Sequence, residues 1–341
     1  MTVAQTAASQ AQLSVRRAIR HSLRDLDPDA PVLVACSGGA DSLALAAGAA
    51  AESAGRRTGA VIIDHGLQEG SAAVADDAAG LCRAFGLDPV QVIAVEPARG
   101  PGSGGPEAAA RDARREALAA AAARCDAHAV LLAHTRDDQA ETVLLRLARG
   151  SGARALSGMA AVDGIWRRPL LDLPRDVVRA SLGDVPAWSD PHNDDPRFAR
   201  VRVRRDAMPS LIEALGPTVV DSLARSARLL RDDADALDAW AGREWGRLVT
   251  PGGSIDWDVD ELLALPRAVR TRLLRRACLA SGSPATDLTA DHIDGIEALV
   301  SDWHGQGALA MPGGVSVARR CGRLSVQPAR GNQSGRRSPA H

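Results

Sequence analysis

The chain has 341 residues, 45% of them hydrophobic, which is enough for one large domain or two of ordinary size. The formal net charge is −1, and neither lysine nor tyrosine occurs. The lack of lysine excludes a Walker-type phosphate loop and any Schiff base formed by a lysine of the protein. The five cysteines include no C-x-x-C pair, which argues against zinc, iron–sulfur and disulfide frameworks.

The same features predict the compartment. Widely spaced cysteines are typical of proteins in a reducing cytoplasm. No apolar run is long enough to span a membrane, and the arginine-rich first 30 residues lack the apolar block of a signal peptide. We therefore expect a cytoplasmic protein with no membrane partner.

After a first helix at 11–25, strand-like and helical segments alternate along the first 150 residues. Strands are expected at 31–36, 59–64, 91–95 and 128–134, and helices at 41–53, 70–85, 106–125 and 138–149. The strands are continuous apolar runs, which is typical of a parallel sheet covered on both faces. The pattern predicts an α/β fold with a doubly wound parallel sheet.

The remainder predicts a second, smaller unit. A glycine- and proline-rich loop at 98–106 is expected to be mobile, and 163–205 to be irregular with one short helix. A long amphipathic helix is expected over 217–249. Helical patterns at 258–265, 266–281 and 289–303 and β-like runs at 308–311 and 315–326 follow. These patterns divide the chain into an α/β domain at 1–215, a connecting helix at 216–250, a smaller, mainly helical domain at 251–327 and a disordered tail at 328–341.

The stretch SGGADS at 37–42 follows the first predicted strand. In a parallel α/β sheet, ligands bind where strands end, and glycines let backbone N–H groups approach an anion at the N-terminus of a helix. A carboxylate beside phosphates would repel them unless a cation lay between, which suggests Mg²⁺ at Asp41. The stretch predicts a phosphate cradle made of Ser37, Gly38, Gly39, Ala40, Asp41 and Ser42. A glycine turn with a helix cap is the structural alternative.

A second polar cluster follows the fourth strand. Asp138 and Glu141 are three residues apart on a predicted helix, so the pair can hold either an ammonium group or a second metal. Asp137 and Asp138 are equally suited to capping and to first-turn charge. His134 ends the strand. The pattern is consistent both with a catalytic base and with a structural histidine at this position. Asp64 and His65 end the second strand, where the ribose or adenine of a nucleotide would lie.

Two segments concentrate arginine despite the balanced net charge, and contact with phosphates is one interpretation of each. RFARVRVRR at 197–205 has five arginines in nine residues, and RAVRTRLLRR at 267–276 forms a basic helix. Solvated surface is the alternative for both.

SGGADS resembles the PP-loop signature of the N-type ATP pyrophosphatases, whose fold is of the adenine nucleotide alpha hydrolase type. Further segments narrow the resemblance to the tRNA(Ile)-lysidine synthase family. They are VIIDHGLQ (61–68), EAAARDARREAL (107–118), LLAHTRDDQAETVLLRLARGSGARALSGM (131–159), RRPLL (167–171) and WSDPHNDDPRFARVRVR (188–204). The resemblance is strong over 30–215 and weaker beyond, where ALAMPGGVSV (308–317) carries it.

The resemblance implies a ligase. Its substrates are ATP, free L-lysine and the tRNA(Ile) with a CAU anticodon, and it uses Mg²⁺. Adenylation of the C2 carbonyl of the wobble cytidine releases pyrophosphate, and lysine then displaces AMP. The lysidine formed changes the codon read from AUG to AUA. The resemblance assigns catalysis to 1–215 and tRNA binding to 251–327.

The resemblance also implies roles for individual residues. The catalytic residues are Asp41, His134, Asp137, Asp138 and Glu141. ATP is bound by residues 37–42 together with Asp64 and His65. Lysine or AMP is bound by Glu107 and Arg111, for which a surface ion pair is the alternative. The tRNA is bound by Arg197, Arg200, Arg202, Arg204 and Arg205.

Three other functions share parts of this pattern. A PP-loop tRNA thiolase would need a reactive cysteine pair, and an amidotransferase-type synthetase would need a glutaminase module. A non-catalytic nucleotide-binding protein would not need both Asp41 and the DDQAET block. The oligomeric state, including a homodimer, is open.

Overall fold

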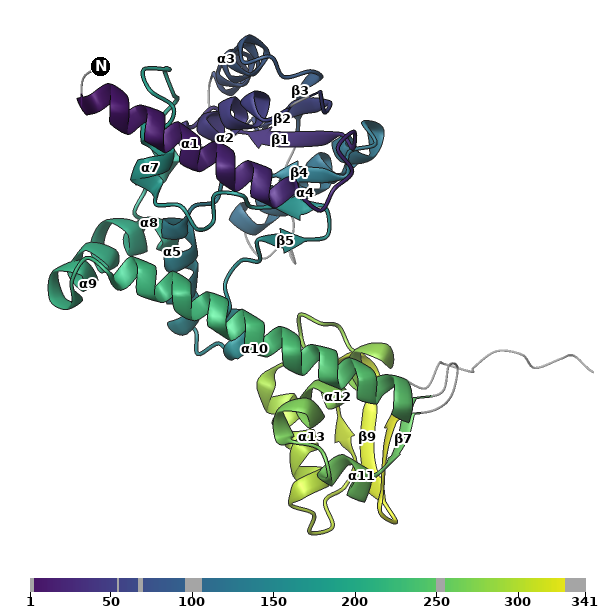
Figure 1. The fold of residues 1–341 in the computed structure, drawn as a ribbon. Helices are drawn as coiled ribbons and strands as arrows, with labels where there is room; N and C mark the ends of the chain where they lie inside the picture. Colours follow the sequence, from purple (N-terminus) through teal and green to yellow (C-terminus); the bar gives the residue numbers. More distant parts are fainter. Residues whose placement is uncertain (1–2, 54, 67–69, 96–105, 250–254, 329–341) are drawn as a thin grey trace, which may run out of the picture. The chain divides into compact units, whose positions relative to one another are not determined.

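The structure is a computed structural model (Figure 1). It describes residues 3–53, 55–66, 70–95, 106–249 and 255–328. The segments expected to be a mobile loop and a disordered tail fall almost entirely outside these ranges. The chain divides into two compact units, Met1–Arg231 and Asp232–His341, and the division falls inside helix α10 (Val219–Leu248). Each unit is described by itself.

The first unit contains a sheet of six strands in the order β3-β2-β1-β4-β6-β5. The strands are β1 (Val32–Cys36), β2 (Thr58–Asp64), β3 (Val90–Ala94), β4 (Ala129–Leu131), β5 (Val162–Asp163) and β6 (Trp166–Arg167). All neighbours pair in parallel except β5, which is antiparallel to β6. The predicted parallel sheet is confirmed. Strand β6 and Asp163 of β5 lie in the segment 163–205, expected to be irregular, because two-residue strands carry no apolar periodicity.

Ten helices of the described chain lie wholly or partly in the first unit. They are α1 (Val3–Leu23), α2 (Ala40–Ala51), α3 (Ser71–Ala84), α4 (Pro106–Arg124), α5 (Arg136–Leu147), α6 (Ala153–Leu156), α7 (Arg175–Ala180), α8 (Ala199–Arg202), α9 (Met208–Leu215) and the first half of α10. A single π-helical turn, Val203–Ala207, joins α8 to α9.

Helices cover both faces of this sheet, as a doubly wound fold requires. Val32, Val34 and Cys36 of β1 pack with side chains of α1, α2, α3 and α7. Leu33 and Ala35 point to the other face and pack with α4 and Trp166. Alternate residues of one strand are thus buried in two different cores, which is why the strand is apolar throughout.

The second unit combines helices with an antiparallel sheet of order β7-β10-β9-β8. Its elements after α10 are β7 (Ile255–Asp258), α11 (Val259–Leu263), α12 (Arg267–Ala280), α13 (Ala290–Ser301), β8 (Leu309–Ala310), β9 (Ser316–Arg320) and β10 (Arg323–Gln327). The β-like run expected at 315–326 is a hairpin. Its turn is made by Cys321 and Gly322, whose positive φ angles, 50° and 76°, are typical of a type I′ turn.

Among the described residues, no helix combines the length and apolarity needed to cross a membrane.

Gly59 is expected to be essential for the packing of β2. A Cβ atom there would lie 2.5 Å from the Pro89 carbonyl oxygen and 2.9 Å from Leu33 Cδ2. We expect Gly59→Ala to lower the free energy of unfolding by about 1–3 kcal/mol, because the Pro89 backbone cannot move aside easily. Gly80→Ala in α3 is the matched control, since nothing lies within 4 Å of its Cβ position. Urea unfolding followed by circular dichroism measures both, and equal stability of the two variants would contradict the packing argument.

Candidate functional site

The loop between β1 and α2 is folded around the hydroxyl of Ser42. This oxygen accepts from the Ser37 N–H (3.1 Å), donates to the Gly39 carbonyl (2.8 Å) and lies 3.2 Å from Ser37 Oγ. Gly38 has a φ of +80°, a conformation that favours glycine, and its carbonyl accepts from the Trp188 N–H at 3.0 Å. The loop is therefore held in one shape by its own serine and by a distant segment.

This shape leaves backbone donors available at the end of β1. Within the described chain, the N–H groups of residues 38–41 donate to no other protein group. Ala40 and Asp41 begin α2, so their N–H groups have no intrahelical acceptor, and the helix dipole adds positive potential. The predicted cradle thus has the donors that an anion requires.

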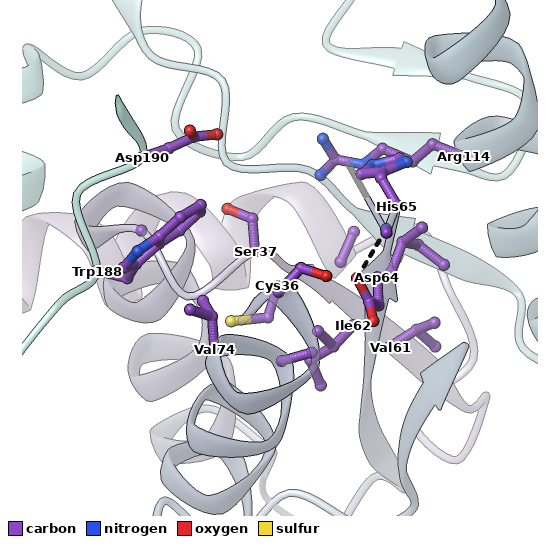
Figure 2. A pocket seen from close by; sticks show the side chains of 16 residues that line it. Cys36, Ser37, Val61, Ile62, Asp64, His65, Val74, Arg114, Trp188 and Asp190 are labelled. Carbon is purple, nitrogen blue, oxygen red and sulfur yellow. Dashed lines mark hydrogen bonds between the residues drawn. The ribbon is translucent and has the colours of Figure 1, made fainter. Parts of the chain in front are cut away.

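A cavity of about 300 Å³ adjoins the cradle (Figure 2). Val61 and Ile62 contribute apolar surface to it, and Trp188 and Arg114 stand on opposite sides with Ser37 between them. Asp64 and His65 also line it, as predicted for a nucleotide site. An indole face beside a phosphate cradle suits a purine ring, which stacks on aromatic side chains.

Two cavity side chains have unused hydrogen-bonding capacity. The Nδ1 atom of His65 is buried without a partner in the described chain, and burial, with the nearby Arg114 charge, lowers the pKa of this histidine. The guanidinium group of Arg114 makes no hydrogen bond or ion pair with a described residue, and burial lowers its pKa. A cation without a carboxylate partner beside the cradle suits a phosphate group.

Beyond the cradle, Asp138 and Glu141 lie in a network with three arginines. Glu141 is 2% exposed at its side chain, and its oxygens accept from Arg204 Nε (2.7 Å), Arg200 Nε (2.9 Å) and Arg175 Nη2 (3.1 Å). Asp138 Oδ1 accepts from Arg175 Nη2 at 2.9 Å. The helix α5 that carries both acids begins with a capping box between Thr135 and Asp138.

The electrostatics of Asp138 follow from these contacts. Burial alone would raise its pKa, but Arg175, the hydrogen bond from the Thr135 backbone N–H and the Arg200 charge outweigh burial and lower the pKa to about 2. Asp138 is therefore an anion at neutral pH. One oxygen of Asp138 caps α5, as the structural alternative predicts, while the other faces the arginines.

Asp41 joins the cradle to this network. Its carboxylate lies 3.2 Å from Arg179 Nε and 3.8 Å from Arg175 Nε. Burial raises the pKa of Asp41, partly offset by the two arginines, and the Asp138 charge raises it further. The structure thus brings together the polar residues predicted after the first and fourth strands.

Asp137 and His134 occupy different environments. Asp137 Oδ2 accepts from the Arg175 backbone N–H at 2.8 Å, so it caps the start of α7. The Nδ1 atom of His134 is buried without a partner in the described chain. Burial lowers the pKa of His134 to about 4, so this imidazole is neutral at pH 7 and a weak base.

The five arginines of 197–205 do not form one surface. Arg200 and Arg204, four residues apart, both turn to Glu141. Arg197 and Arg205 are exposed and pair with Asp195 and Asp194. Arg202 is exposed and donates to the carbonyls of Pro196 and Arg197. Only the three exposed arginines are placed to meet a large partner.

The basic helix α12 is similarly engaged by its own unit. Arg270 forms a buried ion pair with Glu297, whose side chain is 5% exposed. Other arginines of α12 bond to Asp294, to Asp238 and to backbone carbonyls. The guanidinium carbon of Arg276 lies 4.6 Å from the centroid of the Trp245 ring.

The sequence-based interpretation missed three arginines. They are Arg114, Arg175 and Arg179. On helix α4, Arg114 lines the first cavity, whereas Arg111, the predicted residue, is exposed. The side chain of Glu107 lies outside the described part of the structure. Arg175 and Arg179 reach Asp41 from α7. Their four-residue spacing on a short helix after a proline was a usable signal for one shared face.

Next to the network lies a second cavity, of about 180 Å³. Asp137, Glu141, Arg175 and Arg204 line its polar side, and Met208, Pro209, Ile212 and Val220 its apolar side. A cavity lined by two acids, two arginines and several aliphatic side chains suits a flexible aliphatic molecule that carries both an amino and a carboxylate group.

The donor set near Asp41 fits a metal only together with a ligand. No group of three acidic, histidine or cysteine side chains suited to a metal occurs in the described ranges. Mg²⁺ is typically bound by one or two carboxylates together with substrate phosphates and waters. Asp41 beside the cradle fits that pattern.

The fold and the cradle define a PP-loop ATP-binding protein, and a family comparison agrees: residues 11–211 match the PP-loop domain, and residues 258–325 the TilS substrate binding domain. The tRNA(Ile)-lysidine synthase of Thermobifida fusca is 53% identical over 316 residues, which cover 92% of this chain and 96% of that protein. That of Salinispora tropica is 51% identical over 322 residues, covering 92% and 95%. The chain belongs to the tRNA(Ile)-lysidine synthase family.

Among solved structures, the U34-tRNA thiolase NcsA from Methanococcus maripaludis matches with a TM-score of 0.54. It is 19% identical and covers 65% of this chain and 80% of the thiolase. This likeness supports the fold alone.

His134 is expected to make the folded state sensitive to acid. Its pKa in the folded state, about 4, lies below the usual value of 6.5, so the unfolded chain binds the proton more readily. Stability should therefore fall as the pH drops from about 6.5 to 4, and His134→Gln should reduce that loss. Urea unfolding at several pH values measures the difference. Parallel curves for the wild type and the variant would show that His134 titrates normally.

Proposed function

We propose that this chain joins free L-lysine to C2 of the wobble cytidine in the CAU anticodon of tRNA(Ile), with conversion of ATP to AMP and pyrophosphate. The product, lysidine, changes the codon read from AUG to AUA. The observation that carries the proposal is the convergence of a phosphate cradle and a carboxylate–arginine network on Asp41, in a chain that belongs to the lysidine synthase family.

ATP occupies the cradle and the adjoining cavity. Residues 37–42 hold the β- and γ-phosphates, Trp188 stacks on adenine, and Asp64 and His65 face the nucleoside. The cytidine C2 oxygen attacks the α-phosphorus and pyrophosphate leaves, which makes that oxygen part of an AMP leaving group. Backbone N–H groups and Arg114 stabilise the charge that develops on the phosphates.

Asp41 would hold Mg²⁺ together with the phosphates. The ion would supply charge neutralisation when bound. Asp41 also contacts Arg175 and Arg179, so its orientation is set by the protein.

Lysine occupies the second cavity, with its aliphatic chain against Ile212 and Val220 and its ammonium group near Asp137 and Glu141. Only about one amine in 2,500 is neutral at pH 7 at the ordinary pKa of about 10.4. The amine must lose a proton before it attacks C2 and displaces AMP. The sequence leaves His134 open as the proton acceptor or as a structural histidine, and its low pKa makes it a weak base.

The division of labour along the chain is part of the proposal. Residues 1–215 carry out the chemistry, and residues 216–250 form the helix that connects them to the smaller domain. Residues 251–327 contribute to tRNA binding, with Arg197, Arg202 and Arg205 as further contacts. A cytoplasmic location and a homodimer stay predictions. A thiolase or a non-catalytic nucleotide-binding protein is less favoured, because the curated relatives named above are lysidine synthases.

Incubation with ATP, lysine and a CAU-anticodon tRNA(Ile) transcript tests the function. We expect pyrophosphate release and a tRNA mass increased by lysine minus water. Asp41→Ala should abolish both while tRNA affinity changes less than a few-fold, because Asp41 acts on the phosphates. Asp77→Ala, an exposed acid on α3, is the control. Absence of a mass change with the wild-type protein and the cognate tRNA would refute the proposal.

Ile212→Phe tests the lysine cavity. The larger ring would fill space lined by Ile212 and Val220, so the KM for lysine should rise at least ten-fold, on the order of 1.4 kcal/mol, while the KM for ATP stays the same. Leu215→Phe on the same helix is the control, since Leu215 is 67% exposed. An unchanged KM for lysine would place the amino acid elsewhere.

A further inference from the structure

Three arginines of the first unit converge on one short segment, residues 155–160. Arg146 Nη1 donates to the carbonyls of Ala155 and Gly158, the latter at 3.0 Å. Arg231 Nη2 donates to the same Gly158 carbonyl at 2.7 Å, and Arg168 Nη1 donates to the Ala160 carbonyl at 2.7 Å. Two guanidinium groups that share one carbonyl oxygen lie within about 6 Å of each other, where like charges repel.

Hydrogen bonds from a glutamine side chain also hold the backbone of this segment. The side chain of Gln139 accepts from the Met159 N–H at 2.7 Å and donates to its carbonyl at 3.0 Å. Gly158 has a φ of +64°, and a Cβ atom there would lie 2.4 Å from Gln139 Oε1. Gln139 therefore holds the backbone segment to which the arginines donate hydrogen bonds.

Little negative charge balances this group. Arg146 and Arg168 form no ion pair with a described residue, and Arg168 Nε is buried without a partner. Burial lowers the pKa of both, and the nearby Arg111 lowers each further. The charge of Asp163 raises the pKa of Arg168, but Asp163 already forms an ion pair with Arg115 at 3.2 Å.

Two members of the cluster are exposed. The charge of Arg111, on α4, lowers the pKa of Arg146 and of Arg168. The charge of Arg149, just after α5, lowers the pKa of Arg146. The side chain of neither residue makes a hydrogen bond or ion pair with a described residue. Arg111 does not line either cavity described above.

We propose that Arg111 and Arg149, supported by Arg146 and Arg168, bind backbone phosphates of the RNA substrate. Phosphates relieve the repulsion among the arginines, and a nucleic-acid backbone supplies several at short spacing. Residues 139 and 146 share one face of α5, while Asp138 and Glu141 lie on another. RNA held by the cluster would thus lie beside the helix that carries the acids. The inference rests on the proposed function.

The test compares Arg111→Gln/Arg149→Gln with a matched control, Arg17→Gln/Arg83→Gln, which removes two exposed arginines from α1 and α3. The affinity of the full chain for the CAU-anticodon tRNA(Ile) transcript is measured from 50 to 300 mM salt, and ATP affinity is measured in parallel. Loss of two phosphate contacts should reduce the slope of log affinity against log salt by about 1.4–1.8, while the control keeps the wild-type slope.

Each outcome has a distinct meaning. A wild-type slope in the cluster variant overturns the inference, even if the wild-type protein forms lysidine. A fall in ATP affinity would show that Arg111 belongs to the nucleotide site, as the family resemblance suggested, and would also overturn it. A wild-type protein that binds the transcript but forms no lysidine refutes the proposed function and not the RNA-binding surface. A reduced slope with unchanged ATP affinity supports the cluster.

Discussion

The guanidinium group of Arg175 holds the two halves of the site together. It bonds to Asp138 and Glu141 through Nη2 and lies 3.8 Å from Asp41 through Nε. Asp41 follows the central strand β1, whereas the two acids follow β4, so the contact connects two strand ends through one side chain. Glu141 is almost fully buried, and a buried carboxylate is tolerated only where cations compensate for its lost hydration. Removal of a partner from such a group typically costs about 3–5 kcal/mol.

This arrangement also bears on the chemistry of the amine. Carboxylates by themselves would raise the pKa of a bound lysine ammonium and oppose its deprotonation. In this structure Arg175, Arg200 and Arg204 surround Asp138 and Glu141, so an amine that enters meets acids whose charge is already largely balanced. The proposed lysine site can therefore bind the amino group through hydrogen bonds while favouring its neutral form. The acids predicted from the sequence would by themselves raise the pKa of the bound amine. The tertiary contacts with three arginines reduce that effect.

Arginine is the basic residue used throughout, and its surroundings decide its role. Arg270 is buried against Glu297, Arg114 lines the cavity next to residues 37–42, and Arg197 is exposed. A run of arginines in the sequence therefore says little about a binding surface. In 197–205, helical geometry and the π-helical turn direct Arg200 and Arg204 inward and leave the others at the surface. The cluster around 155–160 has no such run, because its arginines come from α4, from α5 and the turn after it, from the residue after β6 and from α10.

The sequence by itself determined the parallel α/β sheet, the glycine-rich turn predicted to bind phosphate and the position of the acids after the fourth strand, because apolar runs and glycine-rich turns are local signals. The same holds for Asp64 and His65, which end β2 and line the cavity. Only the tertiary structure decided that Arg114 rather than Arg111 lines that cavity, that Arg175 joins Asp41 to Glu141, and that Asp137 caps α7. The contacts of Arg175 with Asp138 and of Arg179 with Asp41 join residues 37 and 138 positions apart, and no local pattern encodes a partner at that distance.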